Sequence, residues 1–305
     1  MYEKFFNLRE LPFSLTPDTQ FFFNKQSHRA ALNTLLVALK HSEGFIKIVG
    51  EVGTGKTLLC RQLLAQLDDH VITAYIPNPY LTPDELKGLV AGEIGVSFDR
   101  DIPSYKLLSA IYNRLIQLAR DGTQVVLVVD EAQAMPRETI ESLRLLTNLE
   151  TEKRKLLQVV LIGQPELDVL LARPDLRQLK QRIVFSEYLR PFDHKGVSYY
   201  LAYRLASAGC KQRLFSSMAQ WLIFIGSAGI PRLINILAHK ALISAYGRGD
   251  RIVGSYHVAR AIVDTGESRR WGKLMALRWH LLWPALGGAS AACVLVAPHW
   301  FGGIL

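Results

Sequence analysis

Short apolar runs alternate along the first 190 residues with segments whose apolar positions recur at helical spacing. QVVLVVD (124–130) and LLQVVLI (156–162) are apolar almost throughout, which is typical of strands buried on both faces. GFIKIVG (44–50), VITAYIP (71–77) and IVFSEYL (183–189) predict three further strands. Helices are predicted between the strands, over residues 28–40, 56–67, 82–94 and 105–121. This alternation predicts an α/β fold with a doubly wound parallel sheet.

The pattern changes after Pro191, where helical spacing continues but no further strand is predicted. An α/β nucleotide-binding domain over residues 28–190 is therefore expected to precede a small all-helical lid domain over residues 191–266. The lid helices are predicted at residues 194–208, 216–227, 231–246 and 255–263. Residues 1–27 are rich in phenylalanine, and we expect them to form a strap packed on the core.

A phosphate-binding pattern lies between the first predicted strand and the helix after it. Residues 50–57 read Gly-Glu-Val-Gly-Thr-Gly-Lys-Thr and fit G-x-x-x-x-G-K-[ST]. Lys56 is expected to reach the β- and γ-phosphates of ATP, and the Thr57 hydroxyl to ligate Mg²⁺. Backbone N–H groups and the helix dipole would hold the phosphates. The other nucleotide-binding residues expected from this loop are Gly50, Gly53, Thr54, Gly55 and Leu58.

An acidic pair ends the buried strand at 125–131, as the second half of such a site requires. Asp130 is expected to hold Mg²⁺, and Glu131 to polarise the attacking water as a general base. An isolated Asp-Glu pair is more often a helix N-cap, but the phosphate loop upstream favours the catalytic interpretation. Gln164 follows the neighbouring strand and is the candidate sensor of the γ-phosphate, with an ordinary turn residue before Pro165 as the alternative.

These motifs, in this order, resemble those of AAA+ ATPases. The resemblance rests on the Walker A motif (50–57), the Walker B motif (125–131) and Gln164 at the sensor 1 position. It implies a role for Arg232 in GIPRLIN (229–235), which matches a sensor 2 motif that leans from the lid onto the nucleotide. The alternative for that segment is an ordinary helix start with proline in its first turn.

The same resemblance implies two more roles and a homo-oligomer, in ring form. Basic residues before the last strand suit an arginine finger that acts on the neighbouring subunit's nucleotide, with Arg182 as first choice and Arg177 as second. The alternative is an ordinary surface arginine. Asn78, at the end of the second strand, resembles the polar residue that restrains the catalytic glutamate in this class.

Longer segments narrow the resemblance to ExeA/GspA-type ATPases of bacterial secretion, and within them to the type IV (MSHA) pilus class. They are the lead-in YEKFFNLRELPFSLTPDTQFFF, LRLLTNLET (143–151), QVVLIGQPEL (158–167) and GIPRLINILAHKAL (229–242). The resemblance implies an ATP hydrolase whose partners are pilus or secretion assembly proteins. GspA-type members continue past a membrane span into a periplasmic peptidoglycan-binding domain, whereas this sequence stops at Leu305, so cell-wall binding is not expected.

The last part of the sequence predicts a membrane anchor. Residues 281–298 carry no charge, and a membrane-spanning helix needs about 20 mostly apolar residues. Four cations precede them in a stretch without acids after Glu267, so the positive-inside rule places the ATPase on the cytoplasmic face of the bacterial inner membrane. We therefore predict a basic linker (267–280) and a transmembrane tail anchor (281–300). A buried or interfacial tail is the alternative, since Pro284 and two glycines weaken a helix.

Charge and composition bear on the partner and the compartment. The formal net charge of +9, from 36 Lys and Arg against 27 Asp and Glu, first suggests nucleic acid. A membrane flank and an ATP site account for much of it, so nucleic acid is not the expected partner. A transposition-helper ATPase of the TniB/MuB type is the alternative function, and a slowly hydrolysing nucleotide-dependent scaffold is another. Three cysteines without metal-binding spacing indicate free thiols in a reducing compartment.

Overall fold

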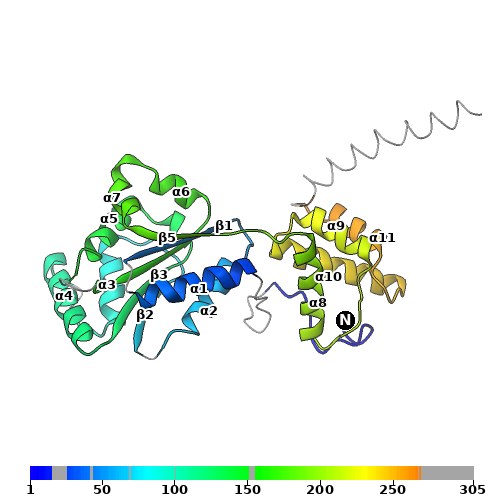
Figure 1. Cartoon of the computed structure of the whole chain (residues 1–305), viewed down its shortest axis with the longest axis horizontal. Coiled ribbons are helices and arrows are strands. Elements are labelled where there is room, and N and C mark those ends of the chain that lie inside the picture. The colour runs from blue at the N-terminus through cyan, green and yellow to red at the C-terminus, as the bar shows by residue number, and fades with distance from the viewer. Residues whose placement is uncertain are drawn as a thin grey trace, which may run out of the picture. The chain divides into compact units, whose positions relative to one another are not determined.

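The structure is a computed structural model, and it describes residues 1–15, 26–41, 44–68, 70–99, 101–150, 155–266 and 268 (Figure 1). The chain divides into two compact units. The α/β unit comprises Thr16–Pro191, and the helical unit comprises Met1–Leu15 together with the chain from Phe192 onward. The α/β unit is therefore inserted, in sequence, between the two segments that form the helical unit.

The α/β unit is built on five strands in the order β2-β3-β4-β1-β5, and all neighbouring strands are parallel. The strands are β1 (Phe45–Gly50), β2 (Val71–Ile76), β3 (Gln124–Val129), β4 (Gln158–Gly163) and β5 (Ile183–Leu189). The predicted parallel α/β sheet is confirmed. The strand predicted from residue 156 begins two residues later, because the Leu156 backbone N–H donates to the Leu149 carbonyl at 3.2 Å and not to a neighbouring strand.

Helices cover both faces of this sheet. Val126 and Val128 of β3 pack with the first two helices, whereas Val125, Leu127 and Val129 pack with the later ones. Successive strand residues point to opposite faces, so β3 is apolar from Val125 onward because both of its faces are buried. The helices are α1 (Gln26–Lys40), α2 (Lys56–Leu64), α3 (Pro83–Glu93), α4 (Ser104–Arg120), α5 (Arg137–Leu146), α6 (Glu166–Leu171) and α7 (Arg177–Gln181), with single 3₁₀ turns at Ala132–Ala134 and Pro174–Leu176.

Within the described part of the helical unit, four helices lie where the helical spacing predicts them. They are α8 (His194–Ser207), α9 (Ser217–Ser227), α10 (Pro231–Arg248) and α11 (Ser255–Val263). Side-chain caps begin two of them: the Asp193 carboxylate accepts from the Gly196 N–H, and the Ser216 hydroxyl accepts from the Ala219 N–H. The last three helices pack against one another, and α8 packs against α9.

The first fifteen residues complete the core of the helical unit. Tyr2, Phe6 and Phe13 are buried there. The Tyr2 hydroxyl lies 2.8 Å from His239 Nδ1 on α10, and the Phe13 ring packs edge-on against Phe215. The predicted strap therefore belongs to the helical unit as far as residue 15, and its remainder up to residue 25 lies outside the described residues.

The membrane anchor predicted at the end of the chain cannot be placed in this fold. Among the described residues, no helix is both long enough and apolar enough to cross a membrane. The predicted basic linker and tail anchor (267–300) lie outside the described residues, apart from Ser268.

Candidate functional site

The loop between β1 and α2 forms the centre of the site, at the edge of the sheet where the strands end. Gly53 and Gly55 have φ angles of 81° and 96°, a region in which side chains other than glycine are strained. The Lys56 ammonium donates to the carbonyls of Gly50 at 2.8 Å and Glu51 at 3.1 Å. Burial lowers the pKa of Lys56, although nearby carboxylates oppose the shift. The lysine side chain therefore folds back onto the loop that is expected to bind phosphates, where it donates to two backbone carbonyls.

Two side chains support this loop from within. The fully buried Thr54 hydroxyl donates to the Glu51 carbonyl at 2.8 Å. Nε2 of His28, on α1, lies 2.8 Å from the Thr54 carbonyl, and a carbonyl can only accept, so this ring nitrogen is the donor. No motif in the sequence points to His28, because its contact joins residues 26 positions apart.

Thr57 and Asp130 meet across the start of α2 and the end of β3. The Thr57 hydroxyl donates to Asp130 Oδ2 at 2.9 Å, and the Glu131 N–H donates to Asp130 Oδ1 at 2.9 Å. Burial raises the pKa of Asp130 despite these hydrogen bonds, and a cation bound beside it would counter that shift by favouring the ionised carboxylate. A hydroxyl and a carboxylate fit Mg²⁺, which takes its other oxygen ligands from substrate phosphates and water. The described residues contain no group of three or more His, Cys, Asp or Glu side chains that could hold a metal alone.

Glu131 and Gln164 also meet, although they follow different strands. Gln164 Nε2 donates to Glu131 Oε2 at 2.8 Å, and Gln133 Nε2 donates to the same oxygen at 2.6 Å. Burial alone would raise the pKa of Glu131, but these two hydrogen bonds and the Lys56 charge outweigh it and lower that pKa. Glu131 has a φ of 51°, an uncommon conformation for a residue other than glycine and one that often accompanies a functional site.

The side-chain amides that donate to Glu131 belong to Gln133 and Gln164, whereas the resemblance implies an amide from Asn78. Asn78 is exposed just after β2, and its Oδ1 accepts from the Tyr80 N–H at 3.2 Å. The restraint of Glu131 by Asn78 therefore stays a prediction. Gln133 was missed by sequence reasoning, and the only available signal was its position two residues after the expected general base.

The three predicted arginines do not lie in the phosphate loop. Arg182 ends α7 just before β5, and β5 runs parallel to β1, so Arg182 lies at the opposite edge of the sheet from the loop. A six-residue strand spans about 20 Å, too far for this arginine to reach its own loop. Arg177 is exposed at the start of α7, and Arg232 is exposed in the first turn of α10, within the helical unit. Their roles stay predictions.

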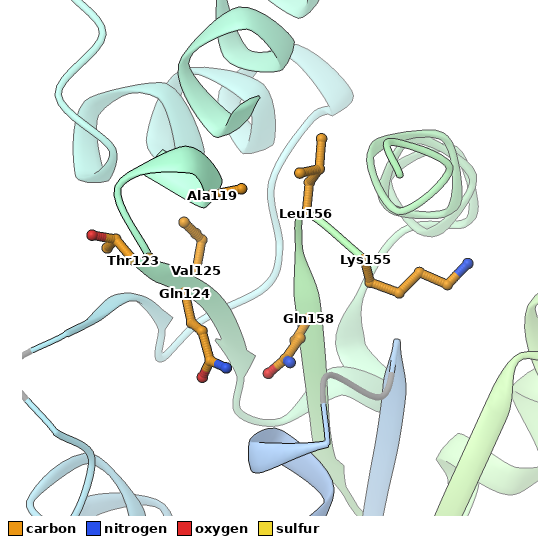
Figure 2. A pocket seen from close by; sticks show the side chains of 8 residues that line it. Ala119, Thr123, Gln124, Val125, Lys155, Leu156 and Gln158 are labelled. Atoms are coloured by element: carbon orange, nitrogen blue, oxygen red, sulfur yellow. The ribbon is translucent and has the colours of Figure 1, made fainter. Parts of the chain in front are cut away.

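A small pocket at that opposite edge is separate from the site (Figure 2). It is lined by residues where β3 and β4 begin, among them Gln124 and Gln158. Gln158 Nε2 donates to the Leu39 carbonyl at 3.0 Å, and its buried Oε1 has no hydrogen-bond partner among the described residues. A water molecule would satisfy this oxygen, so the pocket carries no chemistry of its own.

A parallel sheet that carries this phosphate loop and acidic pair is the arrangement found in AAA-type ATPases. Residues 39–171 match the family model of the AAA domain. The chain is GspA-like in particular: it is 41% identical over 302 residues to general secretion pathway protein A of Aeromonas hydrophila. The match covers 99% of this chain but 54% of that protein, so the chain spans about half the length of the relative.

Solved structures with low sequence identity share the fold. The Cdc6p protein of Pyrobaculum aerophilum matches with a TM-score of 0.61 at 18% identity, and the ORC2 protein of Aeropyrum pernix with a TM-score of 0.59 at 16% identity. Each match covers 83% of this chain and 70% of the other chain. At these identities the likeness supports the AAA-type fold alone.

Proposed function

We propose that this chain hydrolyses MgATP to assist the assembly of a bacterial secretion machine or type IV (MSHA-like) pilus at the inner membrane. One observation supports ATP hydrolysis most directly. The Lys56 ammonium, the Thr57–Asp130 pair and the Glu131 carboxylate all lie at the same edge of the sheet. The similarity to general secretion pathway protein A, over nearly the whole chain, supports the link to secretion.

Each polar group at this edge has a role that its contacts favour. Lys56 exchanges its two loop carbonyls for the β- and γ-phosphate oxygens. Thr57 and Asp130 hold Mg²⁺, which neutralises charge on the phosphates when bound. Glu131 takes the proton of the attacking water, as its lowered pKa keeps it ionised at neutral pH. Gln164 senses the γ-phosphate from the end of β4.

We include a homo-oligomer in this function, as the resemblance to AAA+ ATPases implies, in which an arginine of one subunit acts on the nucleotide of its neighbour. Arg182, at the far edge of the sheet, is suited to a neighbouring subunit's nucleotide and not to its own. The uncharged tail of the sequence supplies the membrane attachment in this proposal, and the assembly proteins of the secretion or pilus machinery are its partners.

Glu131→Gln tests this function in the full-length protein. The substitution removes the base but keeps the shape of the side chain, so we expect turnover to fall about 100-fold or more while ATP binding persists. Steady-state phosphate release and binding of a fluorescent ATP analogue measure the two effects. Glu138→Gln, an exposed change of the same kind on α5, is the matched control and leaves both values unchanged.

The trapped Glu131→Gln protein also tests the partners. We expect it to sediment with the membrane fraction and to co-purify with pilus or secretion components in the presence of ATP. A wholly soluble protein that recovers DNA in a salt-sensitive way would contradict the proposal and favour a transposition-helper ATPase. Wild-type turnover in Glu131→Gln would contradict the catalytic assignment itself.

A further inference from the structure

Gln133 lies in the single 3₁₀ turn between β3 and α5, and its side chain joins two strand ends. Its Nε2 donates to Glu131 Oε2 at 2.6 Å, and its Oε1 accepts from the Gln164 backbone N–H at 3.0 Å. Gln164 Nε2 donates to the same Glu131 oxygen at 2.8 Å. These three hydrogen bonds form a closed ring, which we call the glutamine ring, of Glu131, Gln133 and Gln164.

The chemistry of the ring fixes the orientation of the Gln133 amide. A backbone N–H can only donate, so the atom that faces it must be the amide oxygen. An ionised carboxylate can only accept, so the atom that faces Glu131 must be the amide nitrogen. A flipped amide would lose both bonds, so Gln133 holds the glutamate in one arrangement.

The backbone leaves room for this amide at one position. A Cβ atom on Gly163, the last residue of β4, would lie 2.9 Å from Gln133 Oε1 and 2.9 Å from Leu167 Cδ2. A Cβ atom there would force the Gln133 amide or the Leu167 side chain to shift, so glycine at this strand end lets the glutamine approach without displacement. The close contact between Gln133 and the end of β4 therefore involves residues of both β4 and the turn after β3.

The glutamine ring also selects which carboxylate oxygen faces outward. Among the described residues, both side-chain donors to Glu131 end on Oε2. Oε1 is thereby left to accept from a water molecule. If Gln164 turns toward a phosphate, Gln133 still holds Oε2, so the carboxylate keeps its orientation while the sensor moves.

We propose that Gln133 is a positioning residue for ATP hydrolysis: it fixes the Glu131 carboxylate and links it to the backbone at the end of β4. This inference rests on the proposed role of Glu131 as general base. Gln133 touches neither nucleotide nor water in this scheme and acts through Glu131 alone.

Gln133→Ala tests the inference by separating kcat from KM. Loss of one hydrogen bond to a charged group at the reacting centre lowers kcat about tenfold. The phosphate loop is untouched, so the KM for ATP and the affinity for a fluorescent ATP analogue change less than about twofold. In the Glu131→Gln background the same alanine causes no further loss, because a residue that acts through Glu131 has nothing left to position.

Gln133→Glu is the second variant and keeps the size of the side chain. Its carboxylate still accepts from the Gln164 N–H but cannot donate to Glu131, so kcat falls at least as far as in Gln133→Ala. Gln117→Glu adds the same charge on the exposed face of α4 and is the matched control, with wild-type kcat. Thermal unfolding of each variant shows whether the fold is retained.

Three outcomes would overturn the inference, and they are distinguishable. Wild-type turnover in Glu131→Gln removes the role of Glu131 and the inference with it. A catalytic loss in Glu131→Gln together with wild-type kcat in both Gln133 variants removes the inference alone. A double variant that shows the product of the two single losses assigns Gln133 a purely structural role.

Discussion

Burial sets the ionisation of the side chains beside the phosphate loop. Lys56 is 5% exposed and Asp130 is 2% exposed, and burial lowers the pKa of the ammonium while it raises the pKa of the carboxylate. Both shifts disfavour the charged form, because the two buried groups have little contact with the water that would stabilise their charges. Phosphates and Mg²⁺ would supply the opposite charges, so these two buried groups suit the proposed nucleotide site.

Cys60 offers a test of this buried environment that does not depend on activity. It lies on α2 one turn after Lys56 and is fully buried, and burial, with a smaller contribution from Asp130, raises its pKa to about 12. Because the thiolate is the reactive form, we expect Cys60 of the native protein to resist iodoacetamide at about pH 8. Mass spectrometry of the Cys60 peptide measures the labelling. The protein in denaturant is the control and should label fully; rapid labelling of the native protein would contradict the buried placement.

The sequence indicates some residues of the site but not others, for a physical reason. Lys56, Thr57 and Asp130 lie in motifs whose spacing follows from strand and helix geometry, so their positions are readable. His28 and Gln133 contribute through contacts made only after folding, and neither lies in a motif. Gln133 depends on a glycine that lies 30 positions further along the chain, at the end of another strand.

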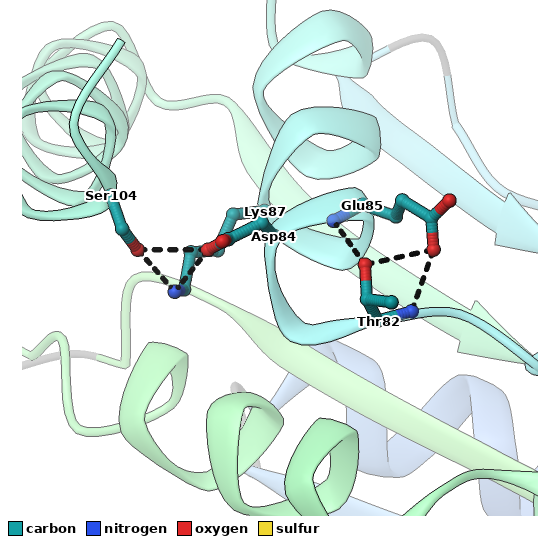
Figure 3. A network of polar contacts seen from close by, with 5 residues as sticks. All are labelled: Thr82, Asp84, Glu85, Lys87 and Ser104. Carbon is teal, nitrogen blue, oxygen red and sulfur yellow. Dashed lines mark hydrogen bonds and ion pairs between the residues drawn. The ribbon is translucent and has the colours of Figure 1, made fainter. Parts of the chain in front are cut away.

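At the scale of elements, the start of α3 shows how local chemistry fixes a boundary (Figure 3). The Thr82 hydroxyl accepts from the Glu85 N–H at 3.3 Å, and Glu85 Oε2 accepts from the Thr82 N–H at 2.7 Å. This reciprocal pair is a capping box, and Pro83 follows at the first helical position. Beside it, Lys87 Nζ donates to Asp84 Oδ1 at 3.0 Å and to Ser104 Oγ at 2.6 Å, which ties α3 to the start of α4.

Thr82→Ala should lower the free energy of unfolding by about 1 kcal/mol, because the first turn of α3 loses its hydroxyl cap. Thr82→Ser keeps the cap and is the matched control. The hydrogen bonds from Thr82 lower the pKa of Glu85, so their contribution is present above the ordinary carboxyl pKa and is lost as pH falls through the lowered value. Urea unfolding at neutral and acidic pH measures both effects. A cost of Thr82→Ala that grows in acid would contradict this assignment.

Element length explains most of the helix predictions but not the absence of one for α5, which has ten residues and was not predicted. Helices α1 to α4 and α8 to α11 each span two turns or more, so their apolar spacing is visible in the sequence. Helices α6 and α7 have six and five residues and are too short for that period to show. The predicted start of β4 is two residues early because Leu156 is buried like a strand residue, while its N–H donates to the Leu149 carbonyl and not to a neighbouring strand.

At the scale of the whole molecule, the helical unit depends on both distant parts of the chain that form it. Phe13 is 2% exposed and packs against Phe215, although some 200 positions separate them in the sequence. Apolar spacing can predict a helix, but it cannot predict which unit a lead-in will join. The placement of residues 1–15 with the helical unit is for that reason a result of the structure alone.

Phe13→Ala should destabilise the helical unit by about 3 kcal/mol, since a large buried ring is replaced by a cavity. Amide hydrogen exchange, followed by mass spectrometry, should accelerate in α8 to α11 and remain unchanged in the sheet. Leu11→Ala, at a position in the same segment that is 40% exposed, is the matched control. Faster exchange in the strands with unchanged exchange in the helical unit would contradict the division into two units.

The helical unit can form its core only after both of its distant segments have been synthesised. Residues 1–15 leave the ribosome well before the helices that cover their aromatic side chains, which begin only at His194. At a translation rate of about 5–20 residues per second, this interval lasts roughly 10 to 40 s. The sheet can close once β5 has emerged, while Tyr2, Phe6 and Phe13 still lack their cover. The aromatic side chains of residues 1–15 therefore stay uncovered on the nascent chain until the helices of the helical unit have been synthesised.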